Sequence, residues 1–160
     1  MLDHRTSIPA LRKTVTVPAT ADRAFEIFTA HVHEWWPLRT HSVAEADAVG
    51  VVFAGGVGGR IVETMADGTF ATWGTVVTWD PPRRVAFTWH PGNPEVEAGH
   101  VEVTFKAQSA RVTIVELVHS GWERRPDGAQ ARLNYDSGWD AVLDKYTVRM
   151  RSLETADEHR

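Results

Sequence analysis

Six polar side chains lie in otherwise apolar segments, where they could move a proton or orient a ligand. They are Arg60, Glu63, His90, Glu116, His119 and Tyr146. Burial raises the pKa of a carboxylic acid and lowers that of a histidine, so enclosed groups of this kind can act as acids or bases. Each one alone is more simply explained as a solvent-facing or core residue. Together they predict that at least one lines a pocket, and none is assigned a catalytic role.

Arg60 and Glu63 lie three positions apart on one predicted strand. Successive side chains of a strand point to opposite faces, so an odd separation sends these two to opposite sides of the sheet. Only one of them can therefore face a cavity, unless a bulge intervenes.

Three common site chemistries are not supported by their spacing. The glycines of residues 55–60 lack the Lys-Ser/Thr and the following helix of a phosphate loop. His31 and His33 would point apart on a helix, so we predict no metal site. No nucleophile elbow accompanies the triad that can be assembled, which is Ser120, His119 and Asp136. We therefore expect no metal and no cofactor.

Tryptophan is the unusual residue of this composition, with seven in 160 residues. Tryptophan buries a large area and is favoured in ligand pockets and interfaces. Trp35 and Trp36 are expected near a cavity mouth. Trp73 and Trp89 are expected on central strands, either as part of the cavity wall or as ordinary core residues. Trp122 and Trp139 are expected to fix a C-terminal helix to the sheet.

The order of elements indicates an α+β domain. Residues 11–17 alternate as a strand, residues 21–28 and 31–36 have helical character, and residues 38–50 are expected to be a loop. Six consecutive strands are expected at residues 51–54, 60–65, 69–79, 84–90, 100–106 and 111–119, with a bulge or bend at Gly74. Without crossover helices they must be antiparallel.

The last element is a long helix over residues 133–153. Its apolar stripe is formed by Trp139, Val142, Leu143, Tyr146, Met150 and Leu153. One helix cannot fill the concavity of a strongly curved sheet, so a cavity between sheet and helix is expected.

A set of short motifs is spread over about residues 12–152: Val15-Thr16-Val17-Pro18-Ala19, Ala24-Phe25, Phe28-Thr29, Trp35-Trp36-Pro37, Gly58-Gly59-Arg60, Glu63, Asp67-Gly68, Trp73-Gly74, residues 79–84, Thr88-Trp89, Gly121-Trp122-Glu123 and Gly138-Trp139. In these motifs the chain resembles the START-like (helix-grip, SRPBCC) superfamily, and within it the AHSA-like branch named for an activator of a heat-shock chaperone ATPase.

This resemblance implies a helix-grip fold: a curved antiparallel sheet of six to seven strands around a long C-terminal helix, with one or two short helices after the first strand. It also implies a deep, largely apolar cavity. We expect one domain at residues 11–153, with tails at 1–10 and 154–160. The expected ligand-binding residues are Phe25, Trp35, Trp36, Arg60, Trp73, Trp89, Glu116, Tyr146 and Met150.

Composition excludes several classes of protein. The net charge of -4 and the isoelectric point near 6.0 argue against a nucleic-acid or anionic-membrane binder, which needs a basic face. The absence of cysteine excludes disulfides and thiolate chemistry. No signal-peptide pattern begins the chain, so a cytoplasmic location is expected. The excess of arginine over lysine favours a bacterial source.

Three functions follow as hypotheses. The first is a module that binds a small apolar or aromatic ligand in the cavity. The second is a cyclase, dehydratase or hydrolase-like enzyme on the same scaffold, using Glu116, His90, His119 or Tyr146. The third is a stress-associated chaperone partner. The named activator is a longer, two-domain protein, so we do not expect chaperone stimulation from 160 residues. A homodimer through an edge strand or the long helix is compatible with the sequence.

Overall fold

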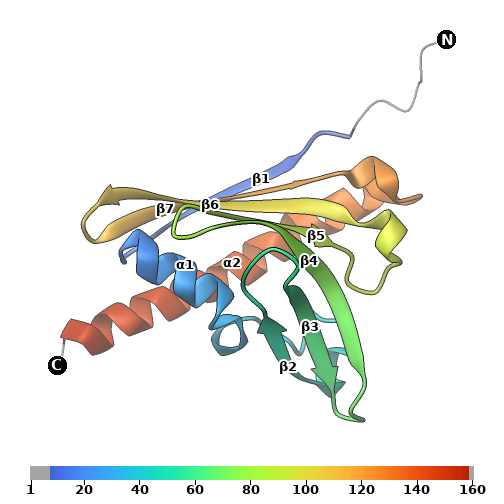
Figure 1. Cartoon of the computed structure of the whole chain (residues 1–160), viewed down its shortest axis with the longest axis horizontal. Coiled ribbons are helices and arrows are strands. Elements are labelled where there is room, and N and C mark those ends of the chain that lie inside the picture. The colour runs from blue at the N-terminus through green and yellow to red at the C-terminus, as the bar shows by residue number, and fades with distance from the viewer. Residues whose placement is uncertain (1–7, 159–160) are drawn as a thin grey trace.

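A seven-stranded antiparallel sheet and one long helix make up most of the molecule (Figure 1). The computed structural model describes residues 8–158. The strand order is β1-β7-β6-β5-β4-β3-β2. In chain order the elements are β1 (Leu11–Val17), α1 (Ala21–Thr29), η1 (Val32–Glu34), η2 (Glu45–Asp47), β2 (Ala48–Phe53), β3 (Arg60–Met65), β4 (Phe70–Asp80), β5 (Arg84–Trp89), η3 (Glu95–Glu97), β6 (Gly99–Ser109), β7 (Val112–Ser120), η4 (Trp122–Arg124) and α2 (Gly128–Glu158).

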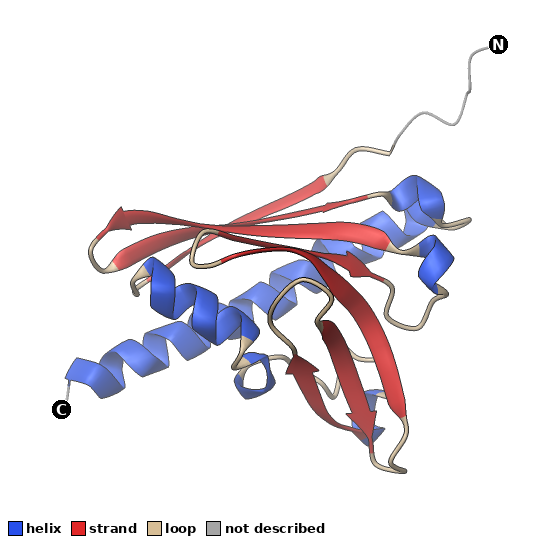
Figure 2. Ribbon diagram, viewed as in Figure 1, coloured by secondary structure: helices blue, strands red, loops and turns tan. Residues whose placement is uncertain are grey.

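The sheet bends strongly around its helices. In Figure 2, β1, β7 and β6 run together across the top, while β2, β3 and the far half of β4 turn away from them. Helices α1 and α2 lie on the same, concave side. The alternation predicted from sequence is confirmed on β6, where Val101, Val103 and Phe105 are buried and His100 is exposed. The predicted helix-grip fold is confirmed.

Helix α2 is longer than its sequence pattern indicated. It begins at Gly128 rather than at Leu133, and it continues to Glu158, past the expected end at Leu153. The predicted apolar stripe does face the sheet: Trp139, Val142, Leu143, Tyr146 and Met150 are each at most 2% exposed. Residues 128–132 contribute only small apolar side chains, such as the buried Ala131, and residues 154–158 are mostly polar, so the periodicity did not reveal either segment.

The N-terminal segment meets this helix. Of the predicted tail, residues 1–7 lie outside the described residues. The carbonyls of Pro9 and Ala10 accept hydrogen bonds from the Arg132 guanidinium at 2.7 and 3.2 Å. Ile8 packs against the core.

Candidate functional site

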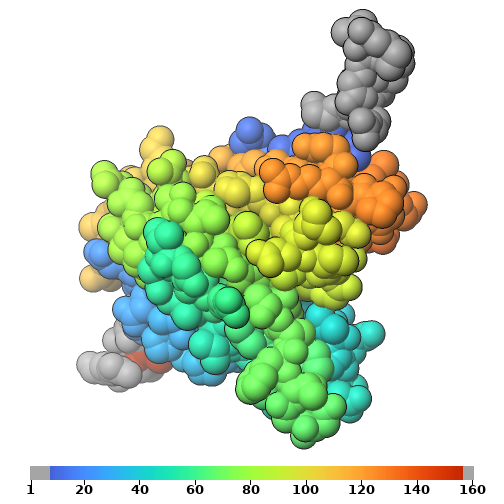
Figure 3. All heavy atoms as spheres, turned by 45° about the vertical axis from the view of Figure 1, so that its right-hand side comes forward, coloured from blue at the N-terminus to red at the C-terminus, as the bar shows by residue number. Residues whose placement is uncertain are grey.

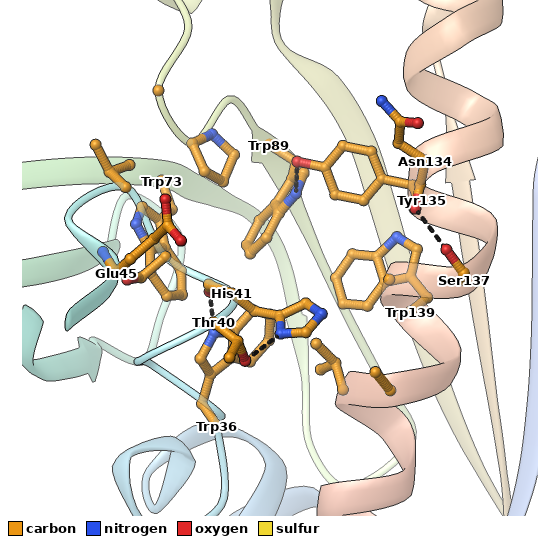
Figure 4. Close-up of a pocket in the computed structure, with 17 residues that line it drawn as sticks. Trp36, Thr40, His41, Glu45, Trp73, Trp89, Asn134, Tyr135, Ser137 and Trp139 are labelled. Carbon is orange, nitrogen blue, oxygen red and sulfur yellow. Dashed lines mark hydrogen bonds between the residues drawn. The ribbon is translucent and has the colours of Figure 1, made fainter.

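A cavity of about 870 Å³ opens between α2 and the bent half of the sheet. Four segments line it: residues 36–45, the inner faces of β4 and β5 at Trp73 and Trp89, Pro91 with Gly92, and the first half of α2 between Asn134 and Val142 (Figure 4). The loops on its two sides meet, because a Cβ placed on Gly92 would lie 3.9 Å from Cγ2 of Val43. Figure 3 shows these two segments, cyan and yellow-green, on the same side of the molecule.

Four indole rings form the wall. The ring centroid of Trp36 lies 5.1 Å from the ring centroid of Trp73, 5.8 Å from that of Trp89 and 5.9 Å from that of Trp139. Trp89 also contacts Trp139 at 5.5 Å, and Tyr135 extends the wall at 6.0 Å from Trp139. Trp73, Trp89 and Trp139 are buried, whereas Trp36 and Tyr135 are partly exposed at the opening. These aromatic side chains therefore form one wall of the cavity, and most of their area is packed against one another.

A bulge in β4 turns Trp73 inward. Opposite it, Ile61 pairs with Gly74 and the next residue, Val62, pairs with Thr72, so Trp73 is the extra residue. A bulge changes the phase of side-chain alternation and re-aims the residue it contains. Gly74 permits the close approach that follows, because a Cβ there would lie 1.7 Å from the carbonyl oxygen of Thr88. The predicted irregularity at Gly74 is confirmed.

Each wall indole donates its N–H to a protein group. Nε1 of Trp36 donates to the carbonyl oxygen of His41 at 2.7 Å, and Nε1 of Trp89 donates to the Tyr135 hydroxyl at 3.2 Å. Trp73 and Trp139 donate to Glu63 and His119, which lie deeper in the molecule. Each of the four indole N–H groups is therefore already hydrogen-bonded within the protein, so a ligand can contact these residues only through their rings.

Glu63 is a fully buried carboxylate that joins the wall to the rim. Its Oε1 accepts hydrogen bonds from Nε1 of Trp73 and from the amide of Val43, both at 2.8 Å. Its Oε2 accepts from the amide of Ala44 at 2.9 Å. Burying a carboxylate is costly unless its oxygens are hydrogen-bonded, and three donors meet that requirement here. Of the pair Arg60 and Glu63, Glu63 is the inward one.

His119 supports Trp139 from behind. Its Nδ1 accepts the Trp139 indole N–H at 3.0 Å, which places the ring proton on Nε2. Burial, with smaller effects from Arg125 and His100, lowers the pKa of His119 to about 3. The imidazole is therefore neutral at pH 7, and its role is to hold Trp139. The bond from Trp139 joins α2 to β7. Trp122, on η4, donates its indole N–H to the carbonyl oxygen of His119 at 2.9 Å, and its ring contacts Tyr135 of α2 at 5.5 Å.

The polar groups of the site lie at the opening. Thr40 and His41 are hydrogen-bonded to each other at 2.7 Å, from Oγ1 to Nδ1, and Figure 4 shows the imidazole between Trp36 and Trp139. Glu45, Asn134 and Ser137 complete the polar rim. Burial raises the pKa of the Tyr135 hydroxyl, so this group is a neutral donor at pH 7.

The structure brings together three of the predicted ligand-binding residues, Trp36, Trp73 and Trp89. Trp35 lies beneath Trp36 and donates to the carbonyl of Ile27, so it supports the wall from outside. Tyr146 does not reach the cavity either. Its buried hydroxyl donates to the carbonyl oxygen of Ala24 at 2.8 Å.

Phe25 and Met150 belong to the core rather than to this cavity. Phe25 packs edge-on against Phe105. Met150 borders a separate, smaller cavity of about 460 Å³ between the beginning of α1 and the end of α2.

Arg60 and Glu116 lie on the other side of the sheet. Arg60 is exposed at the start of β3. Glu116 lies between buried Val115 and Leu117 and is 3.8 Å from Arg12, with 42% of its side chain exposed. Alternation along β7 sends its side chain outward, which corrects the expectation that it faces the cavity. His90 is not among the lining residues, and its Nδ1 lies 3.1 Å from the carbonyl of Asn93.

Sequence reasoning missed His41, Glu45 and Tyr135, and it gave Trp139 only a structural role. A sequence signal for Trp139 and Tyr135 was present, because both lie in the first part of the predicted helix over residues 133–153, whose apolar stripe faces the sheet. His41 and Glu45 lie in a segment without periodicity. Within residues 8–158 no cluster of three potential metal ligands occurs, and none of the helices is long and apolar enough to span a bilayer.

The curved antiparallel sheet and the long C-terminal helix that it surrounds define a helix-grip protein. The sequence model of the family described as activator of Hsp90 ATPase homolog 1-like protein matches residues 18–150, and the chain belongs to this family. None of the curated proteins is significantly similar in sequence.

Several solved structures are similar to this chain over most of its length. The anthrahydroquino-gamma-pyrone synthase Txn09 is 32% identical, with 88% of this chain and 96% of that chain covered and a TM-score of 0.60. The self-sacrificing resistance protein CalC from Micromonospora echinospora is 26% identical over 90% and 95% of the two chains, with a TM-score of 0.64. The Aha1 dimer from Colwellia psychrerythraea, at 17% identity, 88% and 94% coverage and a TM-score of 0.62, supports the fold.

Proposed function

We propose that this protein binds a small, planar aromatic molecule in the cavity between α2 and the bent sheet. The observation that carries the proposal is the wall of four contacting indoles, Trp36, Trp73, Trp89 and Trp139. A volume of about 870 Å³ lies within the range typical of small-molecule sites. Ring faces offer large contact area and stacking, which favours a flat partner of several fused rings.

The polar rim complements this wall. Because the indole N–H groups are all engaged by the protein, side-chain hydrogen bonds to a ligand must come from the polar lining residues, which are Thr40, His41, Ser42, Glu45, Asn134, Ser137 and the Tyr135 hydroxyl. These groups lie at the opening, so the ligand would enter with its apolar rings first and keep its polar end at the rim. The name of the 32% identical relative, which describes a fused aromatic product, agrees with such a ligand.

Fluorescence titration tests this proposal. Anthracenylmethanol, a flat neutral probe, should quench the tryptophan emission saturably and raise the melting temperature. At a hundred times the dissociation constant, binding adds about 2.7 kcal/mol to the free energy of unfolding. Trp36→Ala should weaken binding about fivefold or more, since stacking and burial of one ring contribute about 1–3 kcal/mol.

A matched control variant distinguishes binding in the cavity from non-specific binding of the probe to exposed aromatic side chains. Phe70→Ala removes an aromatic side chain that is 70% exposed on β4, away from the cavity. It should leave the affinity for the probe unchanged. Equal losses in Trp36→Ala and Phe70→Ala, or no saturable quenching in the parent protein, would count against binding in the cavity.

A second candidate is an enzyme that acts on such a ligand, and the identity to a synthase over most of the chain favours it. The acid or base would be His41, because its imidazole lies within the cavity opening, whereas Glu116, His90, His119 and Tyr146 do not converge there. Turnover of a bound polyphenol that is lost in His41→Gln, with binding retained, would support catalysis. Unchanged turnover in this variant would exclude His41.

A further inference from the structure

We propose that the ligand of this cavity carries a positive charge, an amine or quaternary ammonium group, held at the opening by the Glu45 carboxylate and the faces of Trp36 and Tyr135. This inference rests on the proposed function, because it names the charge of the molecule that would occupy the same cavity. Four features of the lining and of the residues that support it carry the inference.

The first feature is the sign of the charged groups. Glu45 is the charged lining residue, and no lysine or arginine lines the cavity within the described part of the chain. Figure 4 shows the Glu45 carboxylate on the Trp73 side of the opening. His41 is the one lining group that can gain a positive charge, by protonation. An anionic ligand would therefore meet a carboxylate and find no fixed cation to pair with.

The second feature is the way the indoles are turned. A cation is attracted to the negative face of an aromatic ring within about 6 Å of its centroid, and tryptophan gives the strongest attraction. Of the aromatic rings that line the cavity, Trp36 and Tyr135 are partly exposed, whereas Trp73, Trp89 and Trp139 are at most 6% exposed and pack behind them. Each of the four indole N–H groups is engaged by a protein group, so the faces of Trp36 and Tyr135 are the aromatic surface left for a cation.

The third feature is Glu63, behind Trp73. Its carboxylate accepts the Trp73 indole N–H at 2.8 Å, and both groups are buried. A hydrogen bond to a buried anion polarises its donor and shifts electron density toward the ring. The negative charge of Glu63 also acts across a medium of low dielectric constant. Both effects increase the attraction of this wall for a cation.

Glu45 is held in place by the backbone around it. It adopts a positive φ of 49°, which is uncommon for a residue other than glycine. Its amide donates to Oγ of Ser42 at 2.9 Å, and the preceding residues Val43 and Ala44 are fixed by Glu63. Strained backbone of this kind often marks a residue held for binding, and here it fixes the start of the carboxylate side chain at the opening.

Three probes with the same ring system and different charge test the inference. They are anthracenylmethyl-trimethylammonium, anthracenylmethanol and anthracenecarboxylate, titrated at low ionic strength and about pH 8, where a free imidazole is neutral. The cation should bind about five- to tenfold more tightly than the neutral alcohol, and the carboxylate more weakly than both. Added salt should reduce the preference for the cation, because it screens Glu45.

Glu45→Gln should reduce the preference for the cation over the alcohol to about twofold or less, chiefly by weakening the binding of the cation. Glu116→Gln, which removes a similar charge from the outer face of the sheet, should leave both affinities as they were.

The two proposals fail in different ways. If the alcohol binds as tightly as the cation, or Glu45→Gln and Glu116→Gln behave alike, the charge inference is wrong and the aromatic site stands. If none of the three probes binds, both proposals are wrong.

Discussion

The indole N–H of Trp73 donates a hydrogen bond to the carboxylate of Glu63 at 2.8 Å, and both side chains are at most 1% exposed. The same carboxylate binds the amides of Val43 and Ala44, so one buried residue joins the wall of the cavity to the loop at its opening. The shape of the site therefore depends on a group that a ligand would not touch.

Glu63→Gln should destabilise the protein by about 1–3 kcal/mol. Glutamine has nearly the same shape, but its NH₂ group replaces an acceptor oxygen, so an N–H donor of Trp73, Val43 or Ala44 loses its partner in the interior. Urea unfolding measures the change. Glu116→Gln, on the outer face, should stay within about 0.5 kcal/mol of the parent. Similar values for the two variants would show that the Glu63 bonds contribute little.

The lowered pKa of His119 leads us to expect a loss of stability in mild acid. Its pKa is about 3 in the folded protein and about 6.5 in an unfolded chain, so between these values the unfolded state binds the extra proton. The free energy of unfolding should thus fall as pH drops below about 6.5, by up to about 1.4 kcal/mol per pH unit from this residue.

Variants isolate this contribution. His119→Asn keeps an acceptor near Trp139 and should flatten the stability profile between about pH 6.5 and 5, a window above the usual carboxylate pKa values. His33→Asn, at a side chain that is 58% exposed, should not flatten it. The assignment fails if the slope survives in His119→Asn.

Tyr146→Phe should cost about 1 kcal/mol, because it removes the buried hydrogen bond from the hydroxyl to the Ala24 carbonyl. Burial also raises the pKa of this hydroxyl well above its usual value. The unfolded chain therefore loses the proton first, and stability should fall as pH rises above about 10. Chemical unfolding at neutral and alkaline pH should show a smaller alkaline loss in the variant. An equal loss would assign it to other groups.

Gly74→Ala should be among the most damaging substitutions, at about 3 kcal/mol or more. Its Cβ would overlap the Thr88 carbonyl oxygen at 1.7 Å, so β4 and β5 must separate beside the cavity. Gly50→Ala is the matched strand control, since no heavy atom lies within 4 Å of its Cβ position. Thermal melting should show a large decrease for the first variant and little change or a small increase for the second. Comparable melting temperatures would contradict the close approach at Gly74.

Local pattern was sufficient for the elements that obey a regular period. The alternation on β6 and the stripe on α2 predicted which side chains are buried, and the odd spacing of Arg60 and Glu63 predicted that they face opposite sides. The same alternation places Glu116 outside, since its neighbours Val115 and Leu117 face the core. Glu116 was predicted to face the cavity because its neighbours in sequence are apolar, although this alternation sends its side chain to the other face.

Other parts of the site depend on contacts between distant residues. The bulge at Trp73 changes the phase of β4, and only the register against β3 shows it. His41 and Glu45 are positioned through a loop whose conformation is fixed by Glu63, about twenty residues further along the chain. No periodicity in residues 38–50 reveals that bond, so the polar rim was not predictable from sequence.

The central claim is that the indoles of the cavity wall contact an aromatic ligand. Nitrogen-15 labelling gives one indole N–H signal for each of the seven tryptophans, and single substitutions assign them. On titration with anthracenylmethanol, the signals of Trp36, Trp73, Trp89 and Trp139 should shift most and saturate together, while that of Trp79, beside Phe25 and not among the lining residues, stays in place. Shifts centred on Trp79, or no saturable shift at any of the four, would contradict the account.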